Sequence, residues 1–277
     1  MTPVTYRTAT LAEVGQLLDW AAQEGWNPGI DDAVAFHAAD PAGFFVAQTD
    51  GQPVAGISVV NHSDSFAFLG LYLCRPAYRG KGIGYGLWAH AMAHAGHRTI
   101  GLDGVPAQEE NYARSGFVLA GRTRRLVGPI PSEPLTLPLA RTQDAEAIAV
   151  LDHAANGVTR KRFLREWLRQ TANRKTVVVH QAGELVGFAT ARQCREDCKI
   201  GPIVAPDAAT ALGLAHQAAA ALGATTGIID VPDTCAAFEQ RLRRNGFIES
   251  FGTARMYRGN PPTTGARLQA VATLELG

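Results

Sequence analysis

The strongest constraint on the fold of this 277-residue chain is an internal repeat, because four short stretches recur in the same order about 130 residues later. The matching pairs are LLDWAA (17–22) with VLDHAA (150–155), GQPVAGI (51–57) with GELVGFA (183–189), LDGVP (102–106) with IDVP (229–232), and RSGF (114–117) with RNGF (244–247). Chance poorly explains an ordered set of matches. We therefore expect two copies of one domain, over residues 1–128 and 138–277. Residues 129–137 are the expected linker, because this part of the chain is rich in proline and proline is disfavoured in helix interiors and central strands.

Both copies combine amphipathic helices with apolar strands in the same order. Thr10 and Glu13 have the spacing of a capping box, and an Asp-Gly turn divides residues 43–62 into a predicted hairpin. In the first copy we also expect helices at 83–97 and 109–117 and strands at 65–74, 99–105 and 118–128. In the second copy we expect helices at 142–155, 159–172, 207–222 and 233–244, and strands at 175–181, 184–193, 198–204, 226–231 and 248–258. This mixture predicts an α/β (α+β) fold around a central sheet.

Charge and cysteine content narrow the class of protein. The net charge is only +1, so no overall field favours nucleic acid or an anionic membrane. We find no apolar run long enough for a membrane span and no signal-peptide pattern. The four cysteines form no dense framework, which is typical of a reducing compartment; they are Cys74, Cys194, Cys198 and Cys235. We therefore expect a cytoplasmic protein, monomeric or homodimeric, that binds a small molecule and no metal.

Residues 74–88, CRPAYRGKGIGYGLW, place four glycines at alternate positions just before a predicted helix. A helix N-terminus has unpaired N–H groups and about half a positive charge, and glycine allows the backbone to approach an anion closely. The stretch therefore predicts a diphosphate cradle, with a tightly packed glycine turn as the alternative. The P-loop and dinucleotide patterns do not fit, which leaves R-x-x-G-x-G at Arg79, Gly82 and Gly84.

This stretch resembles motif A of the GNAT family of acetyl-CoA-dependent N-acetyltransferases. A second stretch, NYARSGF, is similar to the family's Y-x-x-x-G-F element, with Tyr112, Gly116 and Phe117. The resemblance is good over residues 4–127 and weaker over 136–258. It implies two tandem GNAT folds, each with a mixed, mostly antiparallel central sheet flanked by helices.

The resemblance also implies a cofactor site. Backbone amides of the glycine-rich turn would hold the pyrophosphate of acetyl-CoA, and the strand before the turn would pair with the pantetheine arm. The cofactor-binding residues implied in this way are Tyr72, Cys74, Arg79, Gly80, Lys81, Gly82, Ile83, Gly84 and Asn111. Cys74 is expected to pack rather than react, a nucleophilic role being the alternative.

By the same resemblance, Tyr112 is the general acid that protonates the departing thiolate; packing beside the cofactor without proton transfer is the alternative. The implied reaction is direct attack of a primary amine on the thioester in a ternary complex. An alkyl ammonium must first lose a proton. Candidate bases are Asp103, Glu109 and Glu110, and a water chain is the alternative.

The segment after the first helix flanks the acceptor site in GNAT folds. The candidate acceptor-binding residues are therefore Trp26, Asn27 and Asp31, together with Asp103. The acceptor is expected to be a small-molecule amine, with a protein amine as a further option. A different hypothesis is a non-catalytic acyl-CoA-binding sensor whose second domain binds a small ligand.

The second copy has lost the features of the cradle. Asp207 places a carboxylate where the anion would lie, unless it simply caps the following helix, and Leu242 stands in place of Tyr112. We expect a degenerate domain that walls the acceptor pocket or binds an effector. Its candidate lining comprises residues 198–202 and 251–257, with Arg192, Arg255 and Tyr257 as the polar groups. The tail, residues 265–277, is expected to form a closing strand that packs on the first copy.

Overall fold

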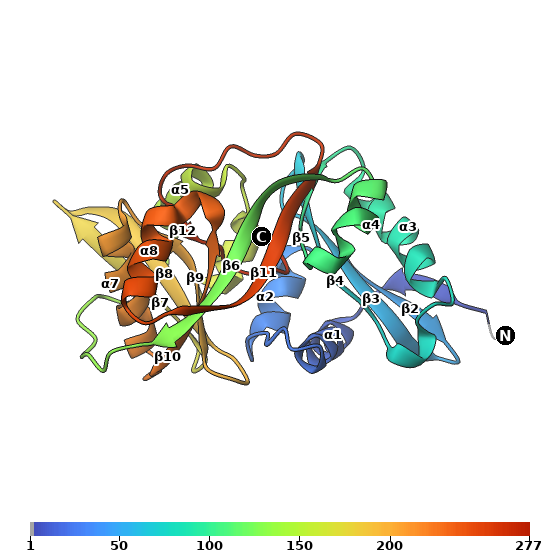
Figure 1. Ribbon diagram of the computed structural model, residues 1–277, viewed down its shortest axis with the longest axis horizontal. Coiled ribbons are helices and arrows are strands. Elements are labelled where there is room, and N and C mark those ends of the chain that lie inside the picture. The colour runs from blue at the N-terminus through green and yellow to red at the C-terminus, as the bar shows by residue number, and fades with distance from the viewer. Residues whose placement is uncertain (1–2) are drawn as a thin grey trace.

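The computed structural model describes residues 3–277 and joins both copies through one continuous sheet (Figure 1). The first copy supplies β1 (Thr5–Thr8), α1 (Leu11–Gln23), α2 (Asp32–Ala39), β2 (Phe44–Thr49), β3 (Gln52–Asn61), β4 (Phe66–Cys74), α3 (Ile83–Ala95), β5 (Thr99–Gly104), α4 (Glu109–Arg114) and β6 (Val118–Pro129). The second supplies α5 (Ala145–Asn156), α6 (Lys161–Trp167), β7 (Arg174–Gln181), β8 (Glu184–Gln193), β9 (Cys198–Val204), α7 (Ala208–Ala220), β10 (Thr226–Pro232), α8 (Ala236–Arg244), β11 (Ile248–Arg258) and β12 (Leu268–Ala270). The predicted fold class, mixed α/β with a mostly antiparallel sheet, is confirmed.

The two copies exchange their last long strands. Strand β6 pairs antiparallel with β10 of the second copy, and β11 pairs antiparallel with β5 of the first copy. The exchanged strands also pair with each other, so the sheet order is β1-β2-β3-β4-β5-β11-β6-β10-β9-β8-β7. In Figure 1 they run side by side across the middle of the molecule. Each copy therefore completes its sheet with a strand of the other, which leaves no free edge between them.

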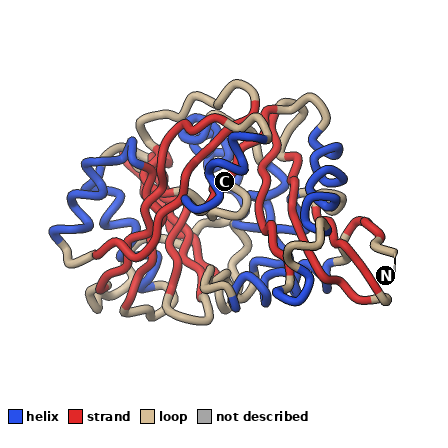
Figure 2. The backbone as a smooth tube through the Cα atoms, turned by 45° about the vertical axis from the view of Figure 1, so that its right-hand side comes forward, coloured by secondary structure: helices blue, strands red, loops and turns tan. Residues whose placement is uncertain are grey.

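Helices cover the sheet on both faces (Figure 2). Helix α3 packs on β2, β3 and β4, while α7 packs on β7, β8 and β9. One apolar cluster contains residues of both copies. In it, Phe36 of α2 stacks on Trp167 of α6 with ring centroids 6.3 Å apart. Helix α2 was missed in the sequence, although its buried positions Asp32, Ala35, Phe36 and Ala39 have helical spacing.

One predicted helix ends early where the copies meet. Helix α6 ends at Trp167 rather than near residue 172, and the chain beyond it turns to contact the first copy. Thr171 Oγ1 and Asn173 Nδ2 donate to the carboxylate of Asp31 over 2.6 and 3.0 Å. The proline-rich segment is anchored as well, since the side-chain oxygen of Gln217 on α7 accepts from the backbone N–H groups of residues 136 and 137.

The C-terminal segment inserts between β9 and β10. These parallel strands pair only at Gly227↔Cys198 and Ile228↔Lys199, and they diverge beyond that point. Strand β12 fills the gap by pairing with β9, and Val271 N donates to Asp230 O of β10 over 3.0 Å. The predicted closing strand is thus confirmed. Within residues 3–277, the helices are all too short or too polar to cross a membrane.

Candidate active site

A cavity of about 880 Å³ opens where β4 and β5 separate. The two parallel strands pair from Phe66↔Thr99 to Leu69↔Leu102, and Gly70 to Cys74 then lie free of β5. The cavity walls come from both copies: its first-copy lining includes β4, the glycine-rich turn and Tyr112, and its second-copy lining is Ser250, Phe251, Thr253, Leu274 and Glu275. The predicted stretch 251–257 therefore contributes to this cavity, next to the first copy's cofactor motif.

Strand β4 bends at the cavity. Leu71 has φ +47°, a left-handed conformation that is uncommon for a non-glycine residue, and the pairing with β3 shifts register between Gly56↔Leu73 and Ser58↔Gly70. This bulge separates the strand from β5 and presents the backbone of Leu71, Tyr72 and Cys74 to the cavity. A slender ligand arm can therefore lie along β4 in place of a neighbouring strand.

The glycine-rich turn forms an amide cradle at one end of the cavity. Gly80 and Gly82 have φ of +72° and +77°, a region that suits glycine, and Gly82 caps the start of α3. Across the described chain, we find no acceptor for the N–H groups of residues 80–85. A Cβ built on Gly80 or Gly82 would meet no atom within 4 Å, whereas one on Gly84 would come within 2.8 Å of the Tyr72 hydroxyl, so the turn is open at its first two glycines and close to β4 at the third. The cradle therefore suits a diphosphate.

Two cations stand beside the cradle. The Arg79 side chain donates to Cys74 O over 2.8 Å and to Glu24 Oε1 over 2.5 Å, so that it bridges the cavity mouth. Lys81 lies with its Nζ 5.4 Å from the ring centroid of Tyr78 and outside the cavity lining. Both side chains are exposed, but Arg79 is held by Glu24 and Cys74 O, whereas Lys81 makes no hydrogen bond to any described residue and can turn toward an arriving anion.

Tyr112 lies at the other side of the cavity, on α4. Its ring stacks on Trp88 with centroids 5.9 Å apart, and Gly104 leaves it room, since a Cβ there would come within 2.4 Å of the ring. Burial, with a smaller effect of Tyr72, raises the pKa of Tyr112 to about 12. The phenol is therefore protonated at neutral pH. Its hydroxyl makes no hydrogen bond to any described residue, which leaves the proton available to a ligand in the cavity.

Cys74 is a weak nucleophile in this setting. Its pKa is raised by burial, against the opposing effect of Arg79, and its thiol donates to the adjacent Arg75 carbonyl over 3.7 Å. The thiolate is the reactive form of cysteine. A protonated Cys74 is consistent with the packing role expected from the sequence.

Asp103 lines the cavity but is fully engaged. Its carboxylate accepts from Arg255 Nε and Nη2 of β11 over 2.9 and 2.5 Å and from Thr253 Oγ1 over 3.3 Å. Burial raises the pKa of Asp103, although Arg255 opposes the effect. Because both carboxylate oxygens are already bonded, Asp103 has little capacity to bind an acceptor or take its proton.

The remaining sequence candidates divide between the cavity and the contact of the two copies. Trp26 lines the cavity. Asn27 instead exchanges hydrogen bonds with the backbone of Glu196, and Asp31 is held by residues 171 and 173. Asn111 donates to Gln108 on the exposed side of α4. Local sequence could not reveal the partners of Asn27 and Asp31, because those partners lie about 140 to 170 residues away.

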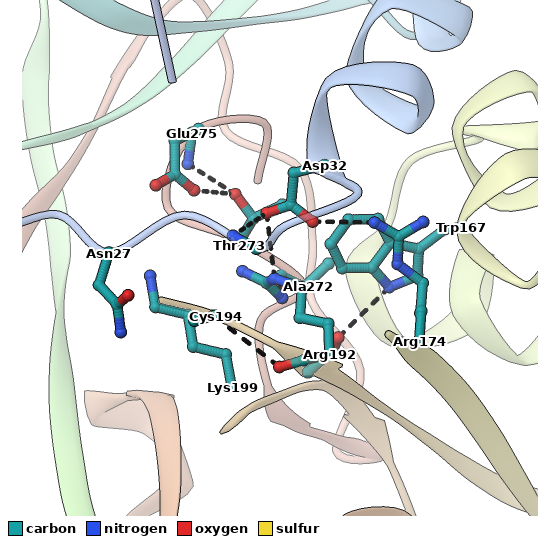
Figure 3. Close-up of polar contacts among 12 residues, drawn as sticks. Asn27, Asp32, Trp167, Arg174, Arg192, Cys194, Lys199, Ala272, Thr273 and Glu275 are labelled. Carbon is teal, nitrogen blue, oxygen red and sulfur yellow. Dashed lines mark hydrogen bonds and ion pairs between the residues drawn. The ribbon is translucent and has the colours of Figure 1, made fainter. Parts of the chain in front are cut away.

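Four lining residues were not among the candidates from the sequence, although two of them belong to the tail that was expected to pack on the first copy: Arg125, Ser250, Leu274 and Glu275. Beside them lies a buried ionic cluster (Figure 3). Arg174 and Arg192 flank Asp32 at 2.9 and 3.2 Å, while Arg125 pairs with Asp230. Burial alone would raise the pKa of Asp32, but the two arginines outweigh it and the pKa is lowered. Arg125–Asp230 joins the two copies directly beside the part of the cavity that the second copy lines, and the Asp32 pairs join them in the same cluster.

The second copy has no comparable cradle. Asp207 caps α7 by accepting from the N–H groups of Ala209 and Thr210 over 2.9 and 2.8 Å. Leu242, at the position of Tyr112, is buried in the core. The gap between β9 and β10 is filled by the chain's own tail. In this copy the helix N-terminus is capped by Asp207, the position of the proton donor holds a leucine, and the gap between the strands is filled by the tail.

Comparison with known proteins finds one GNAT match in each copy. The family described as "Acetyltransferase (GNAT) family" matches residues 11–117, and the one described as "Acetyltransferase (GNAT) domain" matches residues 148–270. A curated relative from Pseudoalteromonas sp. (strain SANK 73390), named "Holothin acyltransferase", is 34% identical over 279 residues, covering 99% of this chain and 94% of the relative.

Solved structures show the same fold at low identity. A putative acetyltransferase from Pyrococcus horikoshii has a TM-score of 0.81 at 19% identity, over 99% of this chain and 96% of that one. A tandem GNAT protein from the clavulanic acid biosynthesis pathway has a TM-score of 0.64 at 18% identity, over 92% and 98%. With its cradle-bearing first copy, its degenerate second copy and a full-length acyltransferase relative, the chain belongs to the GNAT acetyltransferase family as a tandem member.

Proposed function

We propose that the protein transfers an acyl group, in the simplest case the acetyl group of acetyl-CoA, to a primary amine of a small molecule. The observation that carries the proposal is the shared cavity, in which an open amide cradle and a protonated phenol are joined by a strand with free backbone groups. The relative named for holothin acylation supports a small acceptor.

Each part of the cavity has a chemical task in this proposal. When bound, acyl-CoA would supply the acyl group activated as a thioester. The amides of residues 80–85 hold its diphosphate, and the Leu71 to Cys74 backbone orients its arm. As the C–S bond breaks, Tyr112 Oη donates its proton to the departing sulfur. The acceptor nitrogen forms the C–N bond and gives up its proton to water in the cavity, and a proton from water restores the Tyr112 phenol, so that the amide and the free thiol are the products.

The direct test compares Tyr112→Phe with the wild-type protein. A general acid contributes about a hundredfold or more to the rate, so we expect kcat to fall by at least that factor. Affinity for acetyl-CoA should stay within about twofold, because the cradle lies elsewhere. Tyr6→Phe is the matched control, since the Tyr6 ring packs on His90 of α3 and lies outside the cavity lining.

The measurements are free thiol release with holothin and a panel of primary amines, and calorimetric binding of acetyl-CoA. An unchanged kcat in Tyr112→Phe would remove Tyr112 from the chemistry. Tight acetyl-CoA binding without thiol release for any acceptor would favour the acyl-CoA sensor instead.

A further inference from the structure

The tail of the second copy reaches the acceptor end of the first copy's cavity. After β12, Ala272 and Leu276 enter the same apolar cluster as Leu71 and Leu73 of β4. Between these two anchors, Leu274 and Glu275 line the cavity. The contact with β4 is intimate, because a Cβ built on Gly70 would come within 2.1 Å of the Glu275 carbonyl oxygen.

Polar contacts from both copies hold this segment in place. His62 of the first copy contacts Leu276 O through Nε2 over 2.8 Å. Arg192 of the second copy donates to Ala272 O over 2.7 Å, as Figure 3 shows. The side chain of Thr273 is fully buried, and its Oγ accepts from Glu275 N over 2.9 Å. The Glu275 side chain is therefore presented by a rigid turn.

Three carboxylates line the cavity, and they differ in what already occupies their oxygens. Glu24 is paired with Arg79, and Asp103 is paired with Arg255. Glu275 accepts from Thr273 Oγ1 and has no ion-pair partner among residues 3–277. It is only 4% exposed. Its second oxygen accepts no hydrogen bond from residues 3–277 and is not among the fully buried polar atoms that lack a partner, so a ligand or water in the cavity can reach it.

Glu275 also lies at the point where the reaction would occur. Its backbone rests on Gly70, beside the β4 bulge at Leu71. In the proposed function the acyl carbonyl lies against this bulge, between the arm along β4 and Tyr112. Glu275, Leu71 and Tyr112 line the same cavity, so an N–H donor that binds Glu275 would share that cavity with the acyl group.

Resting on the proposed function, we infer that Glu275 is an acceptor-binding residue whose free carboxylate oxygen accepts a hydrogen bond from the N–H of the acceptor amine. The surrounding charges favour an uncharged amine. Arg125 lines the same cavity and Arg192 donates to Ala272 O of the tail, so an ammonium group bound at Glu275 would face buried cations. An uncharged amine also carries the lone pair that attacks the thioester.

The test compares Glu275→Gln and Glu275→Asp with the wild-type protein. The probes are holothin and 4-methoxyaniline, an amine that is uncharged at neutral pH. A hydrogen bond to a charged group corresponds to about a tenfold to hundredfold change, so we expect the amine kcat/KM to fall by that factor in Glu275→Gln, mainly through KM. The KM for acetyl-CoA should remain within about twofold. Glu275→Asp keeps the carboxylate but shortens the side chain by one methylene, so the fall in amine kcat/KM should be smaller than in Glu275→Gln.

Glu146→Gln is the matched control, because Glu146 lies on the exposed surface of α5 and pairs only with Lys161, at 3.3 Å. Amine parameters within about twofold of the wild type in Glu275→Gln would overturn the inference while leaving the proposed function intact. If Glu275→Gln fails to bind acetyl-CoA, Glu275→Asp decides the question in the same assay. If the wild-type protein acylates neither probe, the proposed function fails. In that case calorimetric binding of 4-methoxyaniline to the CoA-saturated protein tests Glu275, and equal affinity in wild type and Glu275→Gln overturns the inference.

Discussion

Gly70→Ala tests whether the tail is a working part of the acceptor pocket. The added Cβ would lie 2.1 Å from Glu275 O and 2.9 Å from Glu275 C, both of them backbone atoms. Real Cβ contacts require at least 3.0 Å, so one side must move by about 1 Å. At Gly70, strand β4 is paired with Ser58 of β3, although it is free of β5, whereas the tail is held at this point by side-chain contacts from His62 and Arg192 and not by sheet pairing. We therefore expect the tail to move.

The size of the effect follows from overpacking, which costs about 1 to 3 kcal/mol. For a chain of this length that corresponds to a melting temperature lower by about 3 to 9 °C. The amine KM should rise, while acetyl-CoA affinity stays within about twofold because the cradle is untouched. Hydrogen exchange should accelerate in residues 268–277, including the Val271 amide that donates to Asp230.

Gly15→Ala is the matched control, since Gly15 lies within α1 and a Cβ there meets nothing within 4 Å. That substitution should stabilise the protein by about 0.5 to 1 kcal/mol. Thermal unfolding, hydrogen exchange and steady-state kinetics are the measurements. A Gly70→Ala protein with wild-type melting temperature, tail protection and amine KM would refute the reasoning.

Two further predictions concern the groups that lock the copies together. Asp32→Ala should lower the free energy of unfolding by about 3 to 5 kcal/mol in urea titration, because Arg174 and Arg192 would remain buried without their carboxylate; a loss below about 1 kcal/mol would contradict this. Burial, assisted by nearby Arg160, lowers the pKa of His62 from 6.5 to about 4, so its contribution is complete above pH 6.5 and is lost as the pH falls toward 4. The free energy of unfolding, measured by urea titration, should drop by up to about 3 kcal/mol over that range. In His62→Gln it should depend less on pH, and an equal dependence on pH in the two proteins would contradict the assignment.

Much of the cofactor end of the site could be predicted because its chemistry is local in sequence. A strand, a turn and a helix N-terminus lie within residues 66–95, and the left-handed glycines are needed wherever that turn occurs. Tyr112 follows from a short pattern, and the structure places it in the cavity lined by the cradle. The absence of a cradle in the second copy could also be predicted from a few neighbouring residues, since Asp207 caps the helix that directly follows it.

The acceptor end could not be predicted in the same way, because its residues come together only in the folded chain. Asp103 was a candidate from its place at a strand end, but β11 brings Arg255 against it. Asn27 and Asp31 lie in the expected segment, yet their side chains contact the second copy. Glu275 carries no motif, and its position depends on how the tail crosses between the copies.

The sequence by itself therefore determined the repeat, the α/β class, the order of the elements and the amide cradle, because each depends on periodicity, turn residues and glycine over a few tens of residues. Only the tertiary structure decided that β6 and β11 change places. It also decided that the tail fills the β9–β10 gap and then places Glu275 at the cavity of the first copy. The physical reason is that an apolar strand has the same local preferences beside its own copy as beside the other. Which edge it joins is settled by the packing of the whole chain.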